Sequence, residues 1–110
     1  MGVMEVNDIL SRIDNADVEI AVKRTAELMY TGLEAARKNP RQNDNWDIVW
    51  VLYLGNGVEI VIGDRHTDFQ PYVAWHCFNG NNYSWGHYCQ TFGEAFLQAV
   101  EKIGHELHID

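Results

Sequence analysis

Two turns rich in asparagine and glycine constrain the fold of this 110-residue chain more than any other feature. Their sequences are Gly55-Asn56-Gly57 and Asn79-Gly80-Asn81-Asn82, and each lies between two segments rich in aromatic and β-branched residues. Asparagine and glycine tolerate the positive φ that tight turns require, and the flanking composition favours strands. The sequence therefore predicts two β-hairpins, one from residues 46–54 and 58–62, the other from residues 72–78 and 83–89.

The loop of the first hairpin decides which side chains share a face. A three-residue loop over 55–57 makes one face of the hairpin wholly apolar, with Trp50, Leu52, Leu54, Val58, Ile60 and Ile62. A two-residue loop of Asn56 and Gly57 shifts the register and distributes these side chains over both faces. We therefore expect the three-residue loop, with its apolar face against the helices.

A helical pattern precedes the hairpins. Apolar residues recur at spacings of three and four from Val18 to Ala36, and Pro40 ends the pattern because its ring clashes with a continuing helix. This pattern predicts a long helix over residues 15–38. A shorter helical pattern, with Asn7 as a suitable N-cap, occupies residues 6–13 and contains Val6, Ile9, Leu10 and Ile13.

A second helical pattern follows the hairpins. Thr91 and Glu94 have capping-box spacing, and the apolar residues after them predict a helix over residues 92–107. The order of elements predicts a single α+β domain over residues 1–110. We expect a four-stranded antiparallel sheet of two consecutive hairpins, with the N-terminal long helix and the C-terminal helix packed on one face.

Composition and charge restrict the class of partner. Apolar residues make up 46% and charged residues 22% of the chain, which is typical of a packed globular domain. Sixteen acidic residues against eight basic ones give a formal charge of −8. This charge disfavours direct binding to nucleic acid or to an anionic membrane, and it favours a protein partner with a basic surface.

The sequence also bears on the cellular compartment. The chain has no apolar run long enough for a membrane span and no basic, apolar start of a signal peptide. We therefore expect a cytoplasmic protein without a membrane partner. Cys77 and Cys89 should remain reduced thiols, since the second hairpin directs their side chains to opposite faces.

A row of aromatic and histidine side chains is the first candidate binding surface. Alternation along the second hairpin, with a symmetric turn, separates this row from Val73, Trp75 and Cys77, which we assign to the core. The row should occupy the uncovered face of the sheet and consists of Tyr72, His76, Phe78, Tyr83, Trp85 and His87, with Tyr53 from the first hairpin. It is interpreted as a protein interface, including a face-to-face homodimer, as a pocket that stacks a flat ligand, or as internal packing under another segment.

Acidic residues near both ends of the chain are the second candidate surface. They are Glu5, Asp8, Asp14, Asp17, Glu19 and Glu101. If the two helices lie side by side, these carboxylates form one negative surface that attracts a basic groove in another protein. The alternative is two solvated helix faces with carboxylates placed near helix N-termini.

Catalytic and metal-binding motifs are absent from the sequence. His76, His87 and Cys89 share a face in this prediction, and His66 lies in a nearby loop, but their spacing does not match known metal frameworks. The loop over residues 63–68 gathers charged groups without a phosphate-binding loop, a nucleophile elbow or an HExxH motif. We therefore assign no metal, no cofactor and no catalytic residue.

These observations favour a small acidic binding or inhibitory protein that acts by protein–protein contact. Two forms of this function fit the size and charge: blocking a basic nucleic-acid-handling protein, as phage anti-defence (anti-CRISPR) proteins do, and neutralising a toxin, as immunity proteins do. The alternative is a small-ligand- or metal-binding domain, or a small enzyme, that uses the histidine and aromatic face of the sheet.

Overall fold

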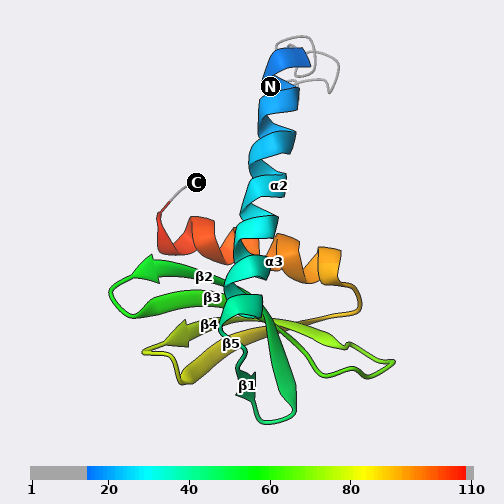
Figure 1. The fold of residues 1–110 in the computed structure, drawn as a ribbon, viewed down its shortest axis with the longest axis vertical. Coiled ribbons are helices and arrows are strands. Elements are labelled where there is room, and N and C mark those ends of the chain that lie inside the picture. The colour runs from blue at the N-terminus through cyan, green and yellow to red at the C-terminus, as the bar shows by residue number, and fades with distance from the viewer. Residues whose placement is uncertain (1–14, 109–110) are drawn as a thin grey trace, which may run out of the picture.

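The computed structural model describes residues 15–108 as two helices and a five-stranded antiparallel sheet (Figure 1). The elements are α2 (Asn15–Lys38), β1 (Gln42–Asn43), β2 (Trp46–Gly55), β3 (Val58–Asp64), β4 (Tyr72–Phe78), β5 (Asn82–Cys89) and α3 (Phe92–Glu106). The strands neighbour one another in chain order. The predicted α+β class is confirmed, and the helix expected over residues 6–13 lies outside the described residues.

The sheet has one strand more than expected. Residues 41–45 lie between the predicted helix and the first predicted strand, where we expected no element, but Gln42 and Asn43 pair with Asp47 and Trp46 of β2. The backbone amide of Ile48 also donates a 3.0 Å hydrogen bond to the carbonyl of Arg41. The strand was not predicted because a segment of two polar residues is too short to show the alternating pattern of a strand.

Both helices contribute to one core on one face of the sheet. The buried members of this core come from four strands and α3: Trp50, Ile60, Ile62, Ala74, Cys89, Ala95, Phe96 and Ala99. The Trp50 and Phe96 rings meet edge to face with centroids 5.8 Å apart, and Met29 and Leu33 of α2 pack against the same core. The C-terminal half of α2 and all of α3 therefore cover this face.

The first hairpin combines the two loops that the sequence left as alternatives. The turn contains only Asn56 and Gly57, both with positive φ, and Gly55 pairs with Val58. A bulge between Tyr53 and Gly55 then restores the predicted pairs of Leu52 with Ile60 and Trp50 with Ile62. The expected three-residue loop is wrong, whereas the expected apolar face is correct, because the bulge absorbs the one-residue shift.

The second hairpin departs from the symmetric turn that we expected. Phe78 pairs with Asn82, so that Tyr83 lies opposite Cys77 and Ser84 opposite His76. An irregularity follows at Trp85, whose φ is 55°, after which His87 lies opposite Ala74. Tyr83 therefore leaves the face that carries His76, and the bulge returns the strand to the original alternation before His87.

The assignment of the second hairpin to faces of the sheet is wrong. In the register of β3 and β4, Ile60 pairs with His76 and Ile62 with Ala74. Because directly paired residues share a face, His76 lies on the helix-covered face. The row of Val73, Trp75 and Cys77, which we assigned to the helix-covered core, belongs to the opposite face instead.

The opposite face forms a second core without any helix. Its buried members are Trp46, Ile48, Val61, Val73, Trp75 and Cys77. Neighbouring strands lie about 4.8 Å apart, and β2 and β5 are three strands apart in the sheet. The centroids of the Trp46 ring in β2 and the Tyr88 ring in β5 nevertheless lie only 5.9 Å apart. The sheet is therefore curled, and its large side chains fill the concave side.

The two cysteines lie in different cores, Cys77 on the concave side and Cys89 under α3, and both are free and buried. The prediction that the second hairpin directs these two side chains to opposite faces is confirmed. Within residues 15–108, the helices do not combine the length and the apolar character that crossing a bilayer requires.

Candidate functional site

The N-terminal half of α2 projects beyond the sheet. Figure 1 shows α2 running away from the strands, while α3 lies across them. All residues in the range 17–27 are exposed, and three of them are large aliphatic side chains: Val18 is 49% exposed, Ile20 47% and Val22 63%. Burial along α2 begins only at Leu28 and Met29.

One apolar stripe connects the projecting half of α2 with the packed half. At 3.6 residues per turn, its members fall within about 60° of the helix circumference. We call this set the α2 stripe: Val18, Val22, Met29, Leu33 and Ala36. Its last three members are buried or partly buried against the sheet, and its first two extend past the sheet into solvent. Ile20 lies on the opposite side of the helix.

Trp50 attaches the packed half of α2. Gly32 lies against the indole, so close that a Cβ at this position would be 2.1 Å from Trp50 Nε1. Only glycine permits this approach, and the indole Nε1 donates a 3.1 Å hydrogen bond to the carbonyl oxygen of Met29. The helix is thus held close to the sheet at the level of Gly32 and projects beyond the sheet at its N-terminal half.

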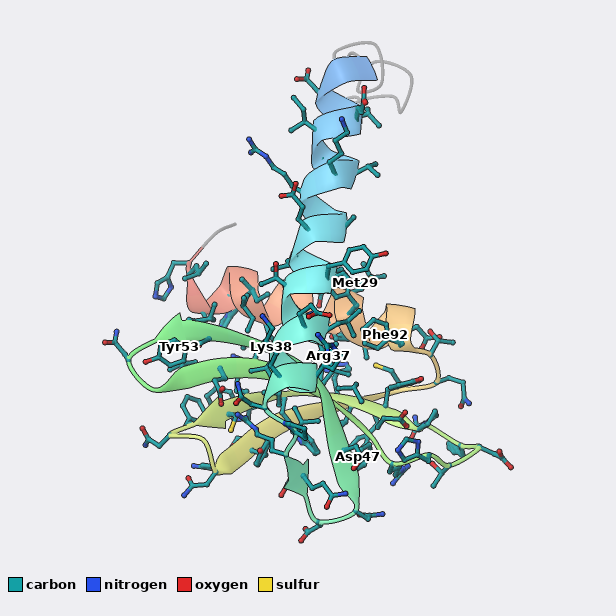
Figure 2. The ribbon with its side chains drawn as sticks, in the orientation of Figure 1. Met29, Arg37, Lys38, Asp47, Tyr53 and Phe92 are labelled. Atoms are coloured by element: carbon teal, nitrogen blue, oxygen red, sulfur yellow. The ribbon has the colours of Figure 1, made fainter. Side chains whose placement is uncertain are left out.

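An apolar groove lies at the foot of the projecting half. The groove has a volume of about 310 Å³ and is lined by Met29, Leu33, Val49, Asp64, Tyr72 and Phe92. Figure 2 shows Met29 of α2 and Phe92 at the start of α3 on the same side of α2. The Tyr72 and Phe92 rings meet edge to face at 5.9 Å. Because Met29 and Leu33 belong to both, the groove continues the α2 stripe.

The predicted acidic surface is not assembled by the described residues. Asp17 and Glu19 lie in the first turns of α2, at the end farthest from the sheet, whereas Glu101 lies on α3 (Figure 1). Glu19 forms an ion pair with Lys23 at 3.2 Å on the same helix. The other three residues of this prediction, Glu5, Asp8 and Asp14, lie outside the described part of the chain.

The predicted aromatic row is divided among several places. His76, Phe78 and Trp85 form one ring cluster on the helix-covered face, with His76 and Trp85 centroids 4.9 Å apart. His76 is only 3% exposed, whereas Trp85 is 66% exposed. The structure therefore does not present this row as one open face.

The remaining members of the row lie apart from the ring cluster. Tyr72 lines the groove beside α2, and His87 lines a second cavity near α3. Tyr83 lies on the concave side, where its hydroxyl accepts a 3.1 Å hydrogen bond from Arg41 Nε. Tyr53 is 62% exposed near the first turn, and its hydroxyl accepts a hydrogen bond from the Gly57 amide.

His76 is a buried polar group. Neither of its ring nitrogens has a hydrogen-bond partner among residues 15–108, although Nε2 lies 3.4 Å from Glu106 Oε2. Burial lowers the pKa of His76, and the charges of Lys102 and His105 lower it further, against the opposing effect of Glu106. The ring is therefore held in its neutral form.

The cavity beside His76 has a volume of about 360 Å³ and is lined by His76, His87, Gln98, Glu101, Lys102 and His105. Lys102 Nζ donates a 2.6 Å hydrogen bond to the carbonyl of Trp85. Despite its three histidines, the part of the chain that the structure describes brings no three potential ligands close enough to hold a metal ion.

The charged loop after β3 forms a solvated histidine–carboxylate cluster. His66 Nε2 lies 2.6 Å from Asp47 Oδ2, and His66 Nδ1 lies 3.4 Å from Asp64 Oδ2. The hydrogen bond with Asp47 and the charge of Asp64 raise the pKa of His66. The Thr67 hydroxyl in this loop accepts a 3.2 Å hydrogen bond from Arg65 Nε and donates a 3.0 Å hydrogen bond to the carbonyl of Phe69, and not to His66. The geometry therefore adds no support for catalysis here.

Arg41 closes the concave side of the sheet. Its Nη1 and Nη2 donate hydrogen bonds of 3.0 and 2.8 Å to the two carboxylate oxygens of Glu59. This hydrogen bonding raises the pKa of Arg41 above its already high usual value. The Arg41 guanidinium links the residue before β1 to side chains on the concave side of the sheet. Its role is therefore structural.

The chain was compared with protein-family models, with curated proteins and with solved structures, and none of them matched. The structure itself therefore carries the functional argument.

The sequence contained a signal for the projecting helix that we did not use. A 24-residue helix is about 36 Å long at 1.5 Å per residue. Five strands spaced about 4.8 Å apart span only about 19 Å across the sheet. A helix that crosses such a sheet must extend past it, so the exposure of some part of α2, although not which part, could have been anticipated.

Proposed function

We propose that this chain is a small binding protein that acts by protein–protein contact, with the N-terminal half of α2 as its contact element. The observation that carries the proposal is the exposure of all residues in the range 17–27, together with the α2 stripe that continues through them. Isolated helical segments of this length are marginal in water, since most helical stability comes from packing of an apolar face. A partner supplies that packing.

The energetics favour contact through the stripe. Val18 and Val22 are about half exposed, and burying what remains exposed contributes on the order of 1 kcal/mol for each side chain. The groove lined by Met29, Leu33 and Phe92 adds a concave apolar surface next to them. Apolar side chains in a concave setting are typical centres of protein interfaces.

Charge supports a protein partner with a basic surface. The segment from residue 39 to residue 108 contains eight carboxylate side chains and three lysine or arginine side chains. These three cations have contacts of their own: Arg41 binds Glu59, Arg65 lies over the Trp46 ring, and Lys102 binds a backbone carbonyl. An acidic domain of this kind attracts basic proteins and repels nucleic acid.

We favour inhibition as the consequence of this binding. A compact acidic domain that occupies the basic site of a nucleic-acid-handling protein or of a toxin prevents access of the natural ligand. Neither form of inhibition requires a catalytic residue, a metal or a cofactor in this chain.

Affinity capture from the native host with three matched baits tests the proposal. Tagged wild type, Val22→Glu and Ile20→Glu are compared, because Val22 lies on the α2 stripe and Ile20 lies on the opposite side of the same helix. We expect a protein that wild type and Ile20→Glu retain and Val22→Glu loses, because burying a carboxylate at position 22 is costly. Circular dichroism checks that all three fold alike. Identical proteins on wild type and Val22→Glu would contradict the proposal.

A further inference from the structure

We propose that the apolar groove beside α2 binds an arginine side chain of the partner protein, with Asp64 as the group that receives the guanidinium. This inference rests on the proposed function, because it names the side chain by which a basic partner is anchored next to the α2 stripe. Three observations carry it: the make-up of the groove, the incomplete pairing of Asp64, and the partners that the neighbouring basic residues have elsewhere.

The groove combines apolar walls with one charged group. Its apolar and aromatic walls are formed by Met29, Leu33, Val49, Tyr72 and Phe92. Asp64 is the one charged residue among the described residues that line it. An arginine side chain has the same division, since its aliphatic stem packs on apolar surface and only its head is charged. The planar guanidinium also packs well on aromatic rings, which favours arginine over lysine here.

Asp64 reaches the groove from the end of β3. It pairs directly with Tyr72 of β4, and directly paired residues share a face of the sheet. Tyr72 lines the same groove, and its ring meets the Phe92 ring edge to face at 5.9 Å. The carboxylate therefore lies on the helix-covered face, close to the aromatic part of the groove.

The carboxylate of Asp64 is largely buried and, among residues 15–108, only partly paired. Its side chain is 16% exposed. Oδ1 accepts a 2.8 Å hydrogen bond from the backbone amide of His66, and Oδ2 lies 3.4 Å from His66 Nδ1. The second distance is longer than the roughly 2.7–2.9 Å of a charge-assisted hydrogen bond. Because a buried carboxylate is costly unless it is fully paired, a cation that enters the groove stabilises Asp64.

The two basic residues that follow Asp64 in the sequence have partners elsewhere. The Arg65 guanidinium lies over the Trp46 ring, 4.7 Å from its centroid, on the concave side of the sheet. The closest carboxylate contact of His66 is with Asp47, where Nε2 and Oδ2 are 2.6 Å apart. The negative charge of Asp64 therefore stays available to a partner.

The groove and the α2 stripe suit one partner element. Val22 and Met29 both belong to the stripe and are seven residues apart, which is about 10 Å along the helix. Seven residues are also two helical turns, so one face of a partner helix packed along α2 brings an apolar residue over Val22 and an arginine to the groove. Figure 2 shows Met29 and Phe92 on the side of α2 where this arginine enters.

NMR titration of the full chain with two small compounds tests the site. Acetyl-arginine amide is compared with acetyl-citrulline amide, which keeps the stem and nearly the size of the head but has no charge. We expect the arginine compound to shift the Met29 methyl and Phe92 ring signals with a dissociation constant at least about fivefold lower than that of the citrulline compound. Equal affinities, or shifts that avoid the groove, would overturn the proposal. This comparison needs no variant and decides the matter even if a variant fails to fold.

Two carboxylate variants test which charge matters. Asp64→Asn keeps an oxygen for the His66 amide and removes the charge, so it should lower the affinity for the arginine compound to that for the citrulline compound. Asp68→Asn removes an exposed charge from the same loop outside the groove, and the affinity should stay within about twofold of wild type. Equal losses in the two variants would mean that the arginine compound responds only to the net charge of the domain, and the site would be overturned.

The arginine site and the proposed function fail in different ways. In affinity capture, Asp64→Asn should weaken retention of the protein that Val22→Glu loses. If Val22→Glu loses this protein and Asp64→Asn retains it as wild type does, the proposed function stands and the arginine site is overturned. If neither variant changes the captured proteins, the proposed function falls, and the arginine site falls with it as a contact for the partner.

Discussion

The indole Nε1 of Trp50 in β2 donates a 3.1 Å hydrogen bond to the backbone carbonyl of Met29 in α2. This contact lies at the level where burial of the helix begins, since all residues in the range 17–27 are exposed and Leu28 is partly buried. Trp50 itself is fully buried and also contacts Phe96 of α3. One side chain therefore joins both helices to the sheet and marks the start of the half of α2 that projects beyond the sheet.

Replacing Trp50 by alanine should destabilise the fold by about 3–5 kcal/mol, because the change empties a large site shared by β2, α2 and α3. Glu101→Ala, on the exposed side of α3, should change stability by less than about 0.5 kcal/mol. Urea denaturation of both variants measures the difference. A loss below about 1 kcal/mol for Trp50→Ala would show that the site collapses around the missing ring or is not a core site.

Two glycine-to-alanine changes should have opposite effects. At Gly32 the new Cβ would lie 2.1 Å from Trp50 Nε1, and we expect a loss of about 1–3 kcal/mol despite the better helix propensity of alanine. At Gly93 the nearest atom is Thr91 Oγ1 at 4.0 Å, so alanine should be neutral or stabilise the protein by up to about 1 kcal/mol. Thermal unfolding of the two variants side by side is the measurement. Equal stability of the two would mean that α2 does not approach Trp50 this closely.

His76 should make the protein less stable in acid. Burial lowers the pKa of His76 in the folded state. The unfolded chain therefore binds a proton more readily, and stability falls as the pH drops below the usual histidine pKa of about 6.5. His76→Phe removes this titration and keeps an aromatic ring, so it should lose less stability than wild type between pH 7.5 and pH 5.5 in urea denaturation.

Histidine NMR titration provides the direct control. His76 should titrate below the usual value, whereas His66 should titrate above it because Asp47 and Asp64 favour its charged form. The contribution of His66 to stability has the opposite sign: it is present below about pH 6.5 and is lost as the pH rises through the raised pKa. A His76 pKa at or above that of His66 would contradict the described burial.

The ion pair of Arg41 and Glu59 should be coupled more strongly than an exposed pair. Their side chains are 29% and 14% exposed, and two hydrogen bonds join them. A double-mutant cycle with Arg41→Gln and Glu59→Gln should give a coupling free energy of about 1–3 kcal/mol. The matched control is Glu34 and Arg37 on α2, which are largely exposed and should be coupled much more weakly. Equal coupling in the two cycles would place Arg41 in solvent.

Features with a strong local cause were predictable from the sequence. The bounds of α2 agree with the prediction from the apolar periodicity and from Pro40. Thr91 caps α3 as expected, because its side chain accepts a 3.1 Å hydrogen bond from the Glu94 amide. The strands around the two Asn/Gly turns were also placed correctly to within one residue at most of their ends, because turn chemistry and β-branched composition act over a few neighbouring residues.

Features that depend on pairing between distant residues were not predictable in the same way. Tyr83 and His76 were placed on one face because alternation was followed across a turn of the wrong length, and a one-residue shift reverses the face of every following residue. The positive φ of Trp85 has no signal in its residue type. The curl of the sheet, which buries Trp75 without a helix, arises from the twist and bulges of all the strands together.

The candidate site shows the same limit. The stripe containing Val18 and Val22 was recognised as one face of an amphipathic helix, and amphipathicity alone assigns such a face to a core. Whether the face meets the sheet depends on how far the sheet extends beneath the helix. That extent follows from the number and tilt of the strands, which the residues of α2 do not encode.

The irregularity at Trp85 has a consequence for aggregation. β1 and β5 are the two edges of the sheet, and an edge strand with a continuous row of free backbone groups is a template on which further chains can add as strands. β1 is only two residues long and leaves most of β2 as an edge, but irregularities at Ile48–Trp50 and Tyr53–Gly55 interrupt β2. The bulge at Trp85 interrupts β5 near its middle, so neither side of the sheet offers a long, flat template. The fold thereby resists open-ended growth into fibrils.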